Sequence, residues 1–226
     1  MATRIIPFHS GINTCYLIRD RGTILIDSGY PGVSKPFNKM LEVSGIKPEE
    51  IKLIVITHGD FDHVGGAKEL KELTGADIAI HEKDRHNLEE GIFHWPKGVT
   101  PWGRLSRSMM KPLLAKRFAF PPVKADLVLG DNEQSLDEFG IPGRIMHTPG
   151  HTPGSVSVLL DSGEAFIGCL AHNKFPFVLK PKLPIYSMDI ELLKQSLKSV
   201  IDKGARILYP GHGKPIPAGM MLRYVN

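Results

Sequence analysis

The chain is short of the features that mark secreted, membrane-spanning or highly charged proteins. It has only two cysteines, Cys15 and Cys169, among 226 residues, which favours a reducing compartment over a disulfide framework. No apolar run approaches the roughly 20 residues that cross a bilayer. Residues 1–10 lack a basic stretch followed by an apolar one, so a secretory signal is not indicated. We therefore expect a cytoplasmic protein without a membrane span.

The excess of one sign of charge over the other is also small. Lys and Arg number 28 against 24 Asp and Glu, which gives a formal charge of +4, and we take this mild excess to be spread along the chain. Such a balance does not predict a nucleic-acid partner, although it suits an anionic small-molecule substrate. Apolar residues make up 42% of the chain, which is enough for a folded core.

Short strands and helices, separated by Gly and Pro, are expected along the chain. The β-branched run Ile51–Ile56 is typical of a buried strand. Asp189 is a suitable N-cap for an amphipathic helix that ends before Gly204. The other expected strands are 13–19, 23–26, 77–80, 127–129, 144–147, 155–160, 165–167 and 206–209, and the other helices are 33–43 and 64–73. Strand-rich halves that also carry helices predict two packed sheets with helices outside.

The segment 88–124 is predicted to be a helical insertion. It combines Trp95 and Trp102 with several Arg and Lys residues. Pro112 is expected to interrupt a continuous helix, which predicts two short helices. Four roles remain open for the segment: an amphipathic cover over the core, a lid, a contact between the two copies of a homodimer, or a surface-binding element.

The strongest chemical signal is the run THGDFDH at residues 57–63, directly after the expected buried strand. His58, Asp60, Asp62 and His63 place four potential metal ligands within six residues. On an extended loop the first three side chains share one face, because side chains alternate with period two. His63 then points elsewhere, towards a second metal. The pattern therefore predicts a site for two metal ions.

Three further candidates follow expected strands. His151 lies in the turn HTPGHTPG, Cys169 follows the strand 165–167, and His212 is flanked by glycines. Taken singly, each has an ordinary explanation, such as a histidine in a turn or a small buried cysteine. Their shared placement at strand ends, where the loops of a site gather, predicts one common site.

These motifs resemble those of the metallo-β-lactamase superfamily and cover nearly the whole chain. The run LIDSG, which contains Asp27, matches the family's first motif, residues 58–63 match its HxHxDH motif, and His151 and His212 match its later histidines. The resemblance implies an αββα sandwich of two mixed β-sheets with helices on the outer faces, built as one domain over residues 1–226. It also implies that Asp27 orients the metal ligands from behind them.

Two positions depart from the family pattern. Asp60 stands where the family has a histidine, and Cys169 stands where it usually has a metal-bridging aspartate. The resemblance then implies two ligand sets: His58, Asp60 and His151 for the first metal, and Asp62, His63, Cys169 and His212 for the second. Three anionic ligands facing two divalent cations leave a net charge of about +1, one less than the usual pattern, so activity is expected to favour higher pH.

The expected cofactor is a pair of divalent metal ions, zinc ahead of iron or manganese. His58, Asp60 and His151 form a 2-His-1-carboxylate set, which also suits non-haem Fe(II), whereas the thiolate of Cys169 favours zinc.

The implied activity is hydrolysis, in which a metal-bound hydroxide cleaves an ester, lactone, thioester or phosphoester. Asp62 is the expected catalytic residue, because it anchors the second metal and orients the nucleophile. Three alternatives stay open: Cys169 as a nucleophile beside a histidine, a non-haem iron oxygenase or redox enzyme, and a non-catalytic ligand-binding relative.

The motifs do not identify the substrate, because proteins of one fold can have many different activities. The apolar side chains of the proline-rich segment 170–188 favour an acyl substrate. The alternative is that they only pack within the loop. Its apolar members are Phe175, Phe177, Val178, Leu179, Leu183, Ile185 and Tyr186. Lys174, Lys180 and Lys182 suit a carboxylate or phosphate. His172 is a candidate for substrate contact, with a surface position as the simpler explanation. No metal role is assigned to the remaining histidines, His9, His81, His86, His94 and His147.

Overall fold

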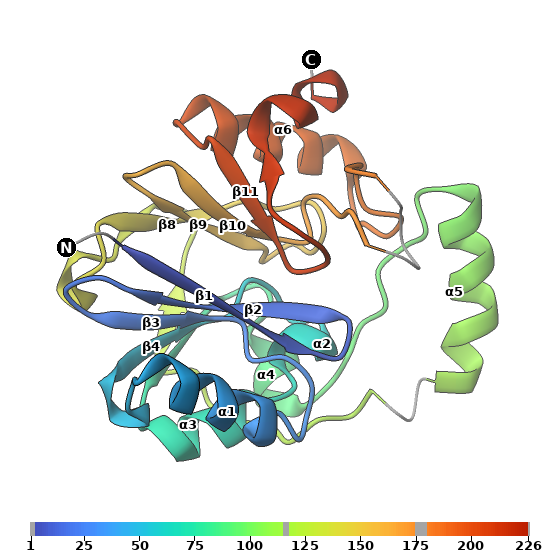
Figure 1. Ribbon diagram of the computed structural model, residues 1–226. Coiled ribbons are helices and arrows are strands. Elements are labelled where there is room, and N and C mark those ends of the chain that lie inside the picture. Colours follow the sequence, from blue (N-terminus) through green and yellow to red (C-terminus); the bar gives the residue numbers. More distant parts are fainter. Residues whose placement is uncertain (1–2, 115–117, 175–179, 226) are drawn as a thin grey trace.

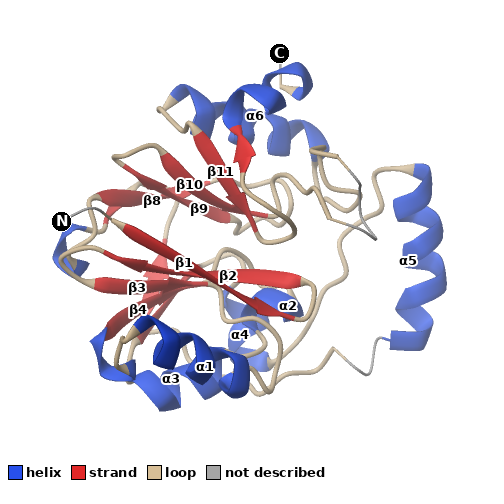
Figure 2. Ribbon diagram, viewed as in Figure 1, coloured by secondary structure: helices blue, strands red, loops and turns tan. Residues whose placement is uncertain are grey.

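The computed structural model describes residues 3–114, 118–174 and 180–225. Two six-stranded sheets lie face to face, with helices on both outer faces (Figure 1, Figure 2). The αββα sandwich of two mixed sheets that the sequence predicts is therefore confirmed. Among the described residues, no helix is long and apolar enough to cross a membrane.

The first sheet has the strand order β1-β2-β3-β4-β5-β6. Its strands are β1 Arg4–Ser10, β2 Asn13–Arg19, β3 Thr23–Ile26, β4 Ile51–Val55, β5 Asp77–His81 and β6 Leu127–Leu129. β1, β2 and β3 pair antiparallel, and β3 through β6 pair parallel. The carboxyl ends of the parallel strands therefore meet at one edge of this sheet.

The second sheet has the order β12-β11-β10-β9-β8-β7. Its strands are β7 Gln134–Ser135, β8 Gly143–His147, β9 Val156–Leu160, β10 Glu164–Gly168, β11 Ile207–Pro210 and β12 Ile216–Pro217. Only β10 and β11 pair parallel, and the other neighbours pair antiparallel. The loops after β10 and β11 thus leave the sheet at the same edge.

Helices flank the sheets and connect the strands. The α-helices are α1 Ser34–Ser44, α2 Phe61–Val64, α3 Ala67–Thr74, α4 Arg85–Glu90, α5 Pro101–Leu114 and α6 Ile190–Asp202. The 3-10 helices within the described residues are η1 Pro48–Glu50, η3 Asp137–Phe139 and η4 Ala218–Tyr224. The predicted cap of α6 is confirmed, because the Asp189 carboxylate accepts hydrogen bonds from the backbone N–H groups of Glu191 and Leu192.

The period-two alternation of the strands divides the interior into layers. On β4, Ile54 packs with Leu25 into the cluster that contains the α1 residue Phe37, whereas Leu53 belongs to the cluster between the sheets. A third cluster, which contains Leu197 of α6, covers the far face of the second sheet. Each sheet is thus buried on both faces, which explains why its strands read as continuous apolar runs.

Two expectations about local structure are wrong. Strand β1 was not expected, because Pro7 is unfavourable in a strand. The strand is also buried irregularly, so its sequence lacks the alternation that marks a strand. The helix α5 is not divided at Pro112 but continues to Leu114, so the one i→i−4 hydrogen bond that a proline cannot donate is missing close to the end of the helix. Helix α5 stands beside the two sheets rather than against an outer face (Figure 1).

Candidate metal centre

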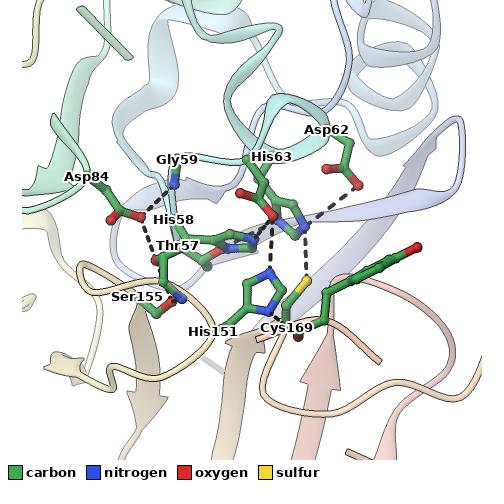
Figure 3. A network of polar contacts seen from close by, with 12 residues as sticks. Thr57, His58, Gly59, Asp62, His63, Asp84, His151, Ser155 and Cys169 are labelled. Carbon is green, nitrogen blue, oxygen red and sulfur yellow. Dashed lines mark hydrogen bonds and ion pairs between the residues drawn. The ribbon is translucent and has the colours of Figure 1, made fainter. Parts of the chain in front are cut away.

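Strand ends bring the seven predicted ligands together from both sheets. They are His58 and Asp60 in the loop after β4, Asp62 and His63 on α2, His151 after β8, Cys169 after β10 and His212 after β11. All seven side chains are buried. Residues that are 154 positions apart in the chain thus face one another, as Figure 3 shows for the central part of the group.

His58, Asp60 and His151 form one half of the cluster. The Asp60 Oδ2 atom lies 3.1 Å from His151 Nε2 and 3.6 Å from His58 Nε2. The ring centroids of His58 and His151 are 4.7 Å apart. These are the three residues that the sequence predicts for a first metal ion.

Asp62, His63, Cys169 and His212 form the other half. His63 Nε2 lies 3.4 Å from Cys169 Sγ and 3.4 Å from His212 Nε2. Asp62 Oδ2 is 3.3 Å from His212 Nε2 and 3.9 Å from His63 Nε2. Cys169 also groups with His58 and His151, with donor atoms within 4.8 Å of one another, so the thiol lies between the two halves.

The predicted geometry of residues 57–63 is wrong in one respect. The segment is extended only as far as Asp60, and α2 begins at Phe61, where the backbone N–H groups of His63 and Val64 donate to Asp60 O. The helical turn, not a period-two loop, therefore sets the directions of Asp62 and His63. It brings these two side chains to the same half of the cluster as His212.

Hydrogen bonds to the Nδ1 atoms fix the orientation of all four imidazoles. His151 Nδ1 donates to Tyr186 O (3.0 Å) and His212 Nδ1 donates to Ile12 O (3.2 Å). His63 Nδ1 donates to Asp27 Oδ2 at 2.7 Å. The Thr57 hydroxyl already donates to Asp27, so it accepts from His58 Nδ1 at 3.0 Å. Each ring consequently turns Nε2 towards the anionic groups, as a metal-ligating histidine does.

Asp27 lies behind the predicted ligands. Its carboxylate contacts His63 and accepts from both the backbone N–H and the hydroxyl of Thr57. The φ angle of Asp27 is 60°, the only positive value among the described non-glycine residues. A non-glycine residue in this region is strained, and here the strain accompanies the contacts that orient His63 and, through Thr57, His58.

Asp84 is a supporting residue that the sequence did not reveal. Its carboxylate accepts from the Gly59 N–H at 2.9 Å, the Gly154 N–H at 2.9 Å and the Thr152 hydroxyl at 2.6 Å. These bonds tie the loop that carries His58 to the loop that carries His151. Asp84 follows β5 in a charged stretch, HEKD, which has the composition of an exposed turn, so no local signal distinguishes it.

The buried charges of the cluster shift one another's pKa values. Burial raises the pKa of the Asp60 carboxyl, but hydrogen bonds from His151 and His58 outweigh it and hold that pKa below its ordinary value. Burial raises the pKa of the Cys169 thiol, yet the positive charges of nearby histidines bring it well below its ordinary value. Burial lowers the pKa of His151, but the Cys169 thiolate and Asp60 raise it to about 10. The anions thus require nearby positive charge, from protons or from metal ions.

His172 is buried, so the expected surface position is wrong. Its ring centroid lies 4.9 Å from that of His212, with the rings perpendicular. Burial lowers the pKa of His172 to about 4, so the ring is neutral at pH 7. His172 lines the cavity above the cluster.

A cavity of about 270 Å³ opens above the cluster. Asp60, Asp62, His151, Cys169 and His212 form its polar floor. Its walls are largely aromatic and include Tyr30, Phe61, Phe93, Trp95, Phe118 and Tyr186. Among the described residues that line it, there is no Lys or Arg.

Only some of the residues that the sequence suggests for substrate contact belong to the described part of the chain. Ile185 and Tyr186 line the cavity, whereas Lys174, Lys180 and Lys182 do not. Phe175, Phe177, Val178 and Leu179, like Lys116 and Arg117, lie outside the described residues.

The donor set fits divalent metal ions. His58 Nε2 and Asp60 Oδ1 are buried and lack a hydrogen-bond partner within the described part of the chain, an arrangement that is costly unless a cation completes it. Imidazole, carboxylate and thiolate are the ligands that zinc takes in proteins. The residues present therefore suit the two ions that the resemblance implies.

Comparisons with known proteins agree with this geometry. The model of the metallo-β-lactamase superfamily matches residues 10–212. The chain is 28% identical to the Beta-lactamase-like protein 2 homolog of Drosophila melanogaster over 96% of this chain and 64% of that protein, so it spans less than two thirds of that relative. It is 28% identical to the hydroxyacylglutathione hydrolase GloC of Haemophilus influenzae over 78% of this chain and 77% of that one.

A solved structure shares the fold across its whole length. The B3 metallo-β-lactamase BLEG-1 superposes with a TM-score of 0.70 at 22% identity, covering 100% of both chains. Together with the matched family model, these relatives support a metal-dependent hydrolase in general. The chain belongs to the metallo-β-lactamase superfamily.

Proposed function

We propose that this protein is a metal-dependent hydrolase that cleaves an uncharged carbonyl substrate: an ester, a lactone or a thioester. The observation that carries this proposal is the meeting of four oriented histidine Nε2 atoms with Asp60, Asp62 and Cys169 on the floor of an aromatic cavity. The relatives support hydrolysis in general, and the bond and substrate are inferred from the lining of the cavity.

The proposed ligands are the two halves of the cluster: His58, Asp60 and His151 for one ion, and Asp62, His63, Cys169 and His212 for the other. Zinc is the proposed metal, because thiolate and imidazole donors favour it over iron or manganese. Bound divalent ions supply an acidified water and polarise the carbonyl oxygen of a substrate.

The chain's own residues prepare the site for that chemistry. Asp27 and the carbonyl of Tyr186 keep His63 and His151 in one tautomer and one orientation. Asp62, which lines the cavity beside His212, is placed to accept a hydrogen bond from the attacking water and so to aim it. The aromatic walls exclude bulk water from the reacting bond, which strengthens the electrostatic interactions there.

The cavity argues against an anionic substrate. A carboxylate or phosphate group that binds against the apolar walls, away from the metal ions proposed for the floor, loses its hydration, which is costly unless a cation pairs with it. Among the described lining residues, no Lys or Arg offers that pairing. We therefore favour neutral acyl substrates over those with an anionic group remote from the metal ions, such as the glutathione thioester that the relative's name indicates.

A substrate panel tests this proposal on zinc-loaded protein. It compares 4-nitrophenyl esters of increasing acyl length, neutral thioesters and lactones with a 4-nitrophenyl phosphodiester and S-lactoylglutathione. We expect kcat/KM to rise with acyl length, because each added methylene is buried against the aromatic walls. A phosphodiester or S-lactoylglutathione as the best substrate would show that the proposed substrate class is wrong.

A second candidate activity rests on a different contact. Cys169 Sγ lies 3.4 Å from His63 Nε2, and His63 Nδ1 lies 2.7 Å from Asp27 Oδ2. This order resembles that of a nucleophile, a base and an orienting carboxylate. The thiolate would then attack the carbonyl carbon, His63 would protonate the departing alcohol, and water would hydrolyse the acyl-cysteine.

The substitution Cys169→Asp separates the two activities. It replaces the thiol with the carboxylate that the family usually has at this position, so a metal-dependent enzyme should keep metal and much of its activity. A cysteine nucleophile would lose all of its activity in this variant, while the wild type would survive chelation and be inactivated by iodoacetamide.

A further inference from the structure

Positive charge is concentrated in one segment, so the expectation that it is spread along the chain is wrong. Residues 91–125 contain no Asp or Glu and seven basic residues: Lys97, Arg104, Arg107, Lys111, Lys116, Arg117 and Lys124. Of the 28 Lys and Arg residues in the whole chain, 21 thus remain elsewhere, against all 24 Asp and Glu residues. A segment of strong positive charge is therefore joined to a slightly acidic body, and α5 lies at its centre.

The outer face of α5 exposes large apolar side chains. Leu105 is 54% exposed and Met109 is 59% exposed, and their spacing of four residues places them on one helix face. Trp102 is 51% exposed on the same helix. Neighbouring Arg104 is exposed as well. Apolar side chains gathered between cations on one helix are typical of an interaction surface rather than of scattered exposed residues.

The inner face of the same helix closes the cavity above the metal centre. Trp102, Ser106 and Met110 recur every four residues, and all three line the cavity. The helix is held close to the second half of the chain, because the Ser106 and Tyr186 hydroxyls lie 2.6 Å apart. A Cβ atom on Gly103 would meet Ile185 O at 2.2 Å, so only glycine permits this approach.

The cavity opens beside the exposed strip. Trp102 and Met110 line the cavity and are at the same time among the exposed apolar side chains, at 51% and 40%. An apolar molecule held at the outer face of α5 would therefore be next to the mouth of the cavity. This continuity links the helix surface to the site below it.

We propose that the outer face of α5 docks on a lipid bilayer rich in anionic lipids. Leu105, Met109 and Trp102 would enter the headgroup region, where apolar and indole side chains are stabilised. The exposed cations Lys97, Arg104 and Lys124 would pair with the lipid phosphates. The docking itself does not depend on the activity proposed above. With that activity, it places the cavity mouth where substrates with long acyl chains are concentrated.

Two other partners fit the surface less well. A second copy of this chain would bring two strongly basic segments together, and like charges repel. A nucleic acid would use the cations through its phosphates, but it would leave Leu105 and Met109 in water. An anionic bilayer uses both the apolar strip and the charge.

Vesicle flotation with the zinc-loaded full chain tests this proposal. The vesicles contain either phosphatidylcholine alone or phosphatidylcholine with phosphatidylglycerol. The docking variant is Leu105→Glu with Met109→Glu, neither of which lines the cavity. Its matched control is Val43→Glu with Met220→Glu, which makes the same charge change at exposed apolar positions of α1 and η4, away from α5 (Figure 1).

We expect the wild type and the control to float with the anionic vesicles and the docking variant to bind about tenfold more weakly or worse. Binding should fall as salt rises. Equal binding to neutral vesicles, or equal loss in the control variant, would overturn the proposal. Two further results would overturn the proposal if neither the wild type nor any variant binds vesicles. One is binding of the wild type to duplex DNA, and the other is a wild-type dimer in solution, in each case abolished in the docking variant.

Hydrolysis of a short soluble ester separates this proposal from the proposed function. The docking variant should hydrolyse it at the wild-type rate, because the metal centre and cavity lining are unchanged. An inactive wild type that still floats would contradict only the hydrolase, whereas an active wild type that does not float would contradict only the docking.

Discussion

Two clusters of histidine and carboxylate groups lie at strand ends in the described part of the chain, and they differ in how their charges are arranged. Besides the cluster on the cavity floor, His81, Asp131 and His147 also bring donor atoms within 4.8 Å of one another. The rings of His81 and His147 stack at 4.0 Å, and Asp131 Oδ1 lies 3.2 Å from His81 Nε2 and 2.9 Å from His147 Nδ1. By distance alone, both clusters resemble metal sites.

Hydrogen bonding separates them. In the second cluster the Lys83 N–H donates to His81 Nδ1 at 3.2 Å, so the His81 proton stays on Nε2, facing Asp131. The Lys83 ammonium already pairs with Asp131 at 2.7 Å, and this carboxylate is 64% exposed. On the cavity floor, by contrast, each Nδ1 is bonded to the protein and buried anions face the Nε2 atoms. Only that arrangement leaves buried anions that depend on added positive charge, either from bound metal ions or from protons on the histidines.

Removing one histidine from each cluster gives the largest expected contrast. His58→Ala should lower zinc content and reduce kcat/KM roughly a hundredfold or more, because it deletes a proposed ligand. His81→Ala removes an equally buried ring but should leave zinc content unchanged. Elemental mass spectrometry and ester hydrolysis measure both effects. Equal loss of zinc in the two variants would break the distinction between the clusters.

The carboxylates give the next contrast. Asp27→Asn keeps the shape of the side chain but removes the charge that orients His63, and loss of such support costs about 10–100-fold in metal affinity. Asp131→Asn should have no such effect. Competition with a fluorescent zinc chelator measures both affinities. An unchanged affinity in Asp27→Asn would contradict the supporting role of Asp27.

Asp60→His tests the charge balance of the cavity floor. It replaces one of the three proposed anionic ligands with a neutral one, so a water activated by the proposed metal ions should become more acidic. The sequence predicts a wild-type pH–rate profile that favours high pH. In Asp60→His we expect this profile to move to lower pH by up to about one unit, and metal retention to tighten if Asp60 weakens the first site. A profile that stays in place or moves to higher pH would be inconsistent with this charge balance.

The smallest effect concerns thermal stability after chelation. The pKa of His151 is raised to about 10 in the folded chain, so its charge stabilises the chelated protein fully below about pH 6.5. That contribution is lost as pH rises through about 10. We expect Tm of the chelated protein to fall by roughly a few degrees more than that of His151→Gln between pH 7 and 10. Parallel Tm curves would exclude this role for His151.

The sequence predicts the fold and the cluster for the same reason. Each predicted ligand follows a strand, and strand ends gather at one edge of a sheet, so local patterns around His58, His151, Cys169 and His212 indicated a shared site. The pattern could not show that α2 starts at Phe61, because four residues are too few for a helical period to appear.

Supporting groups were harder to predict. The bond from His151 to Tyr186 uses a backbone carbonyl, which any residue provides, so its side chain carries no signal. Asp84 and His172 look like surface residues because their partners lie far away in the chain. His172 is buried only once Cys169 and His212 have come together. Contacts of this kind depend on tertiary packing rather than on local sequence.

Metal stoichiometry is the measurement that tests the central claim most directly. Elemental mass spectrometry of untagged protein, purified without chelator, should find two divalent ions per chain, zinc foremost, both lost on chelation together with activity. A chain that carries no divalent metal, yet hydrolyses esters until iodoacetamide blocks Cys169, would contradict the metal-dependent mechanism and favour the cysteine nucleophile.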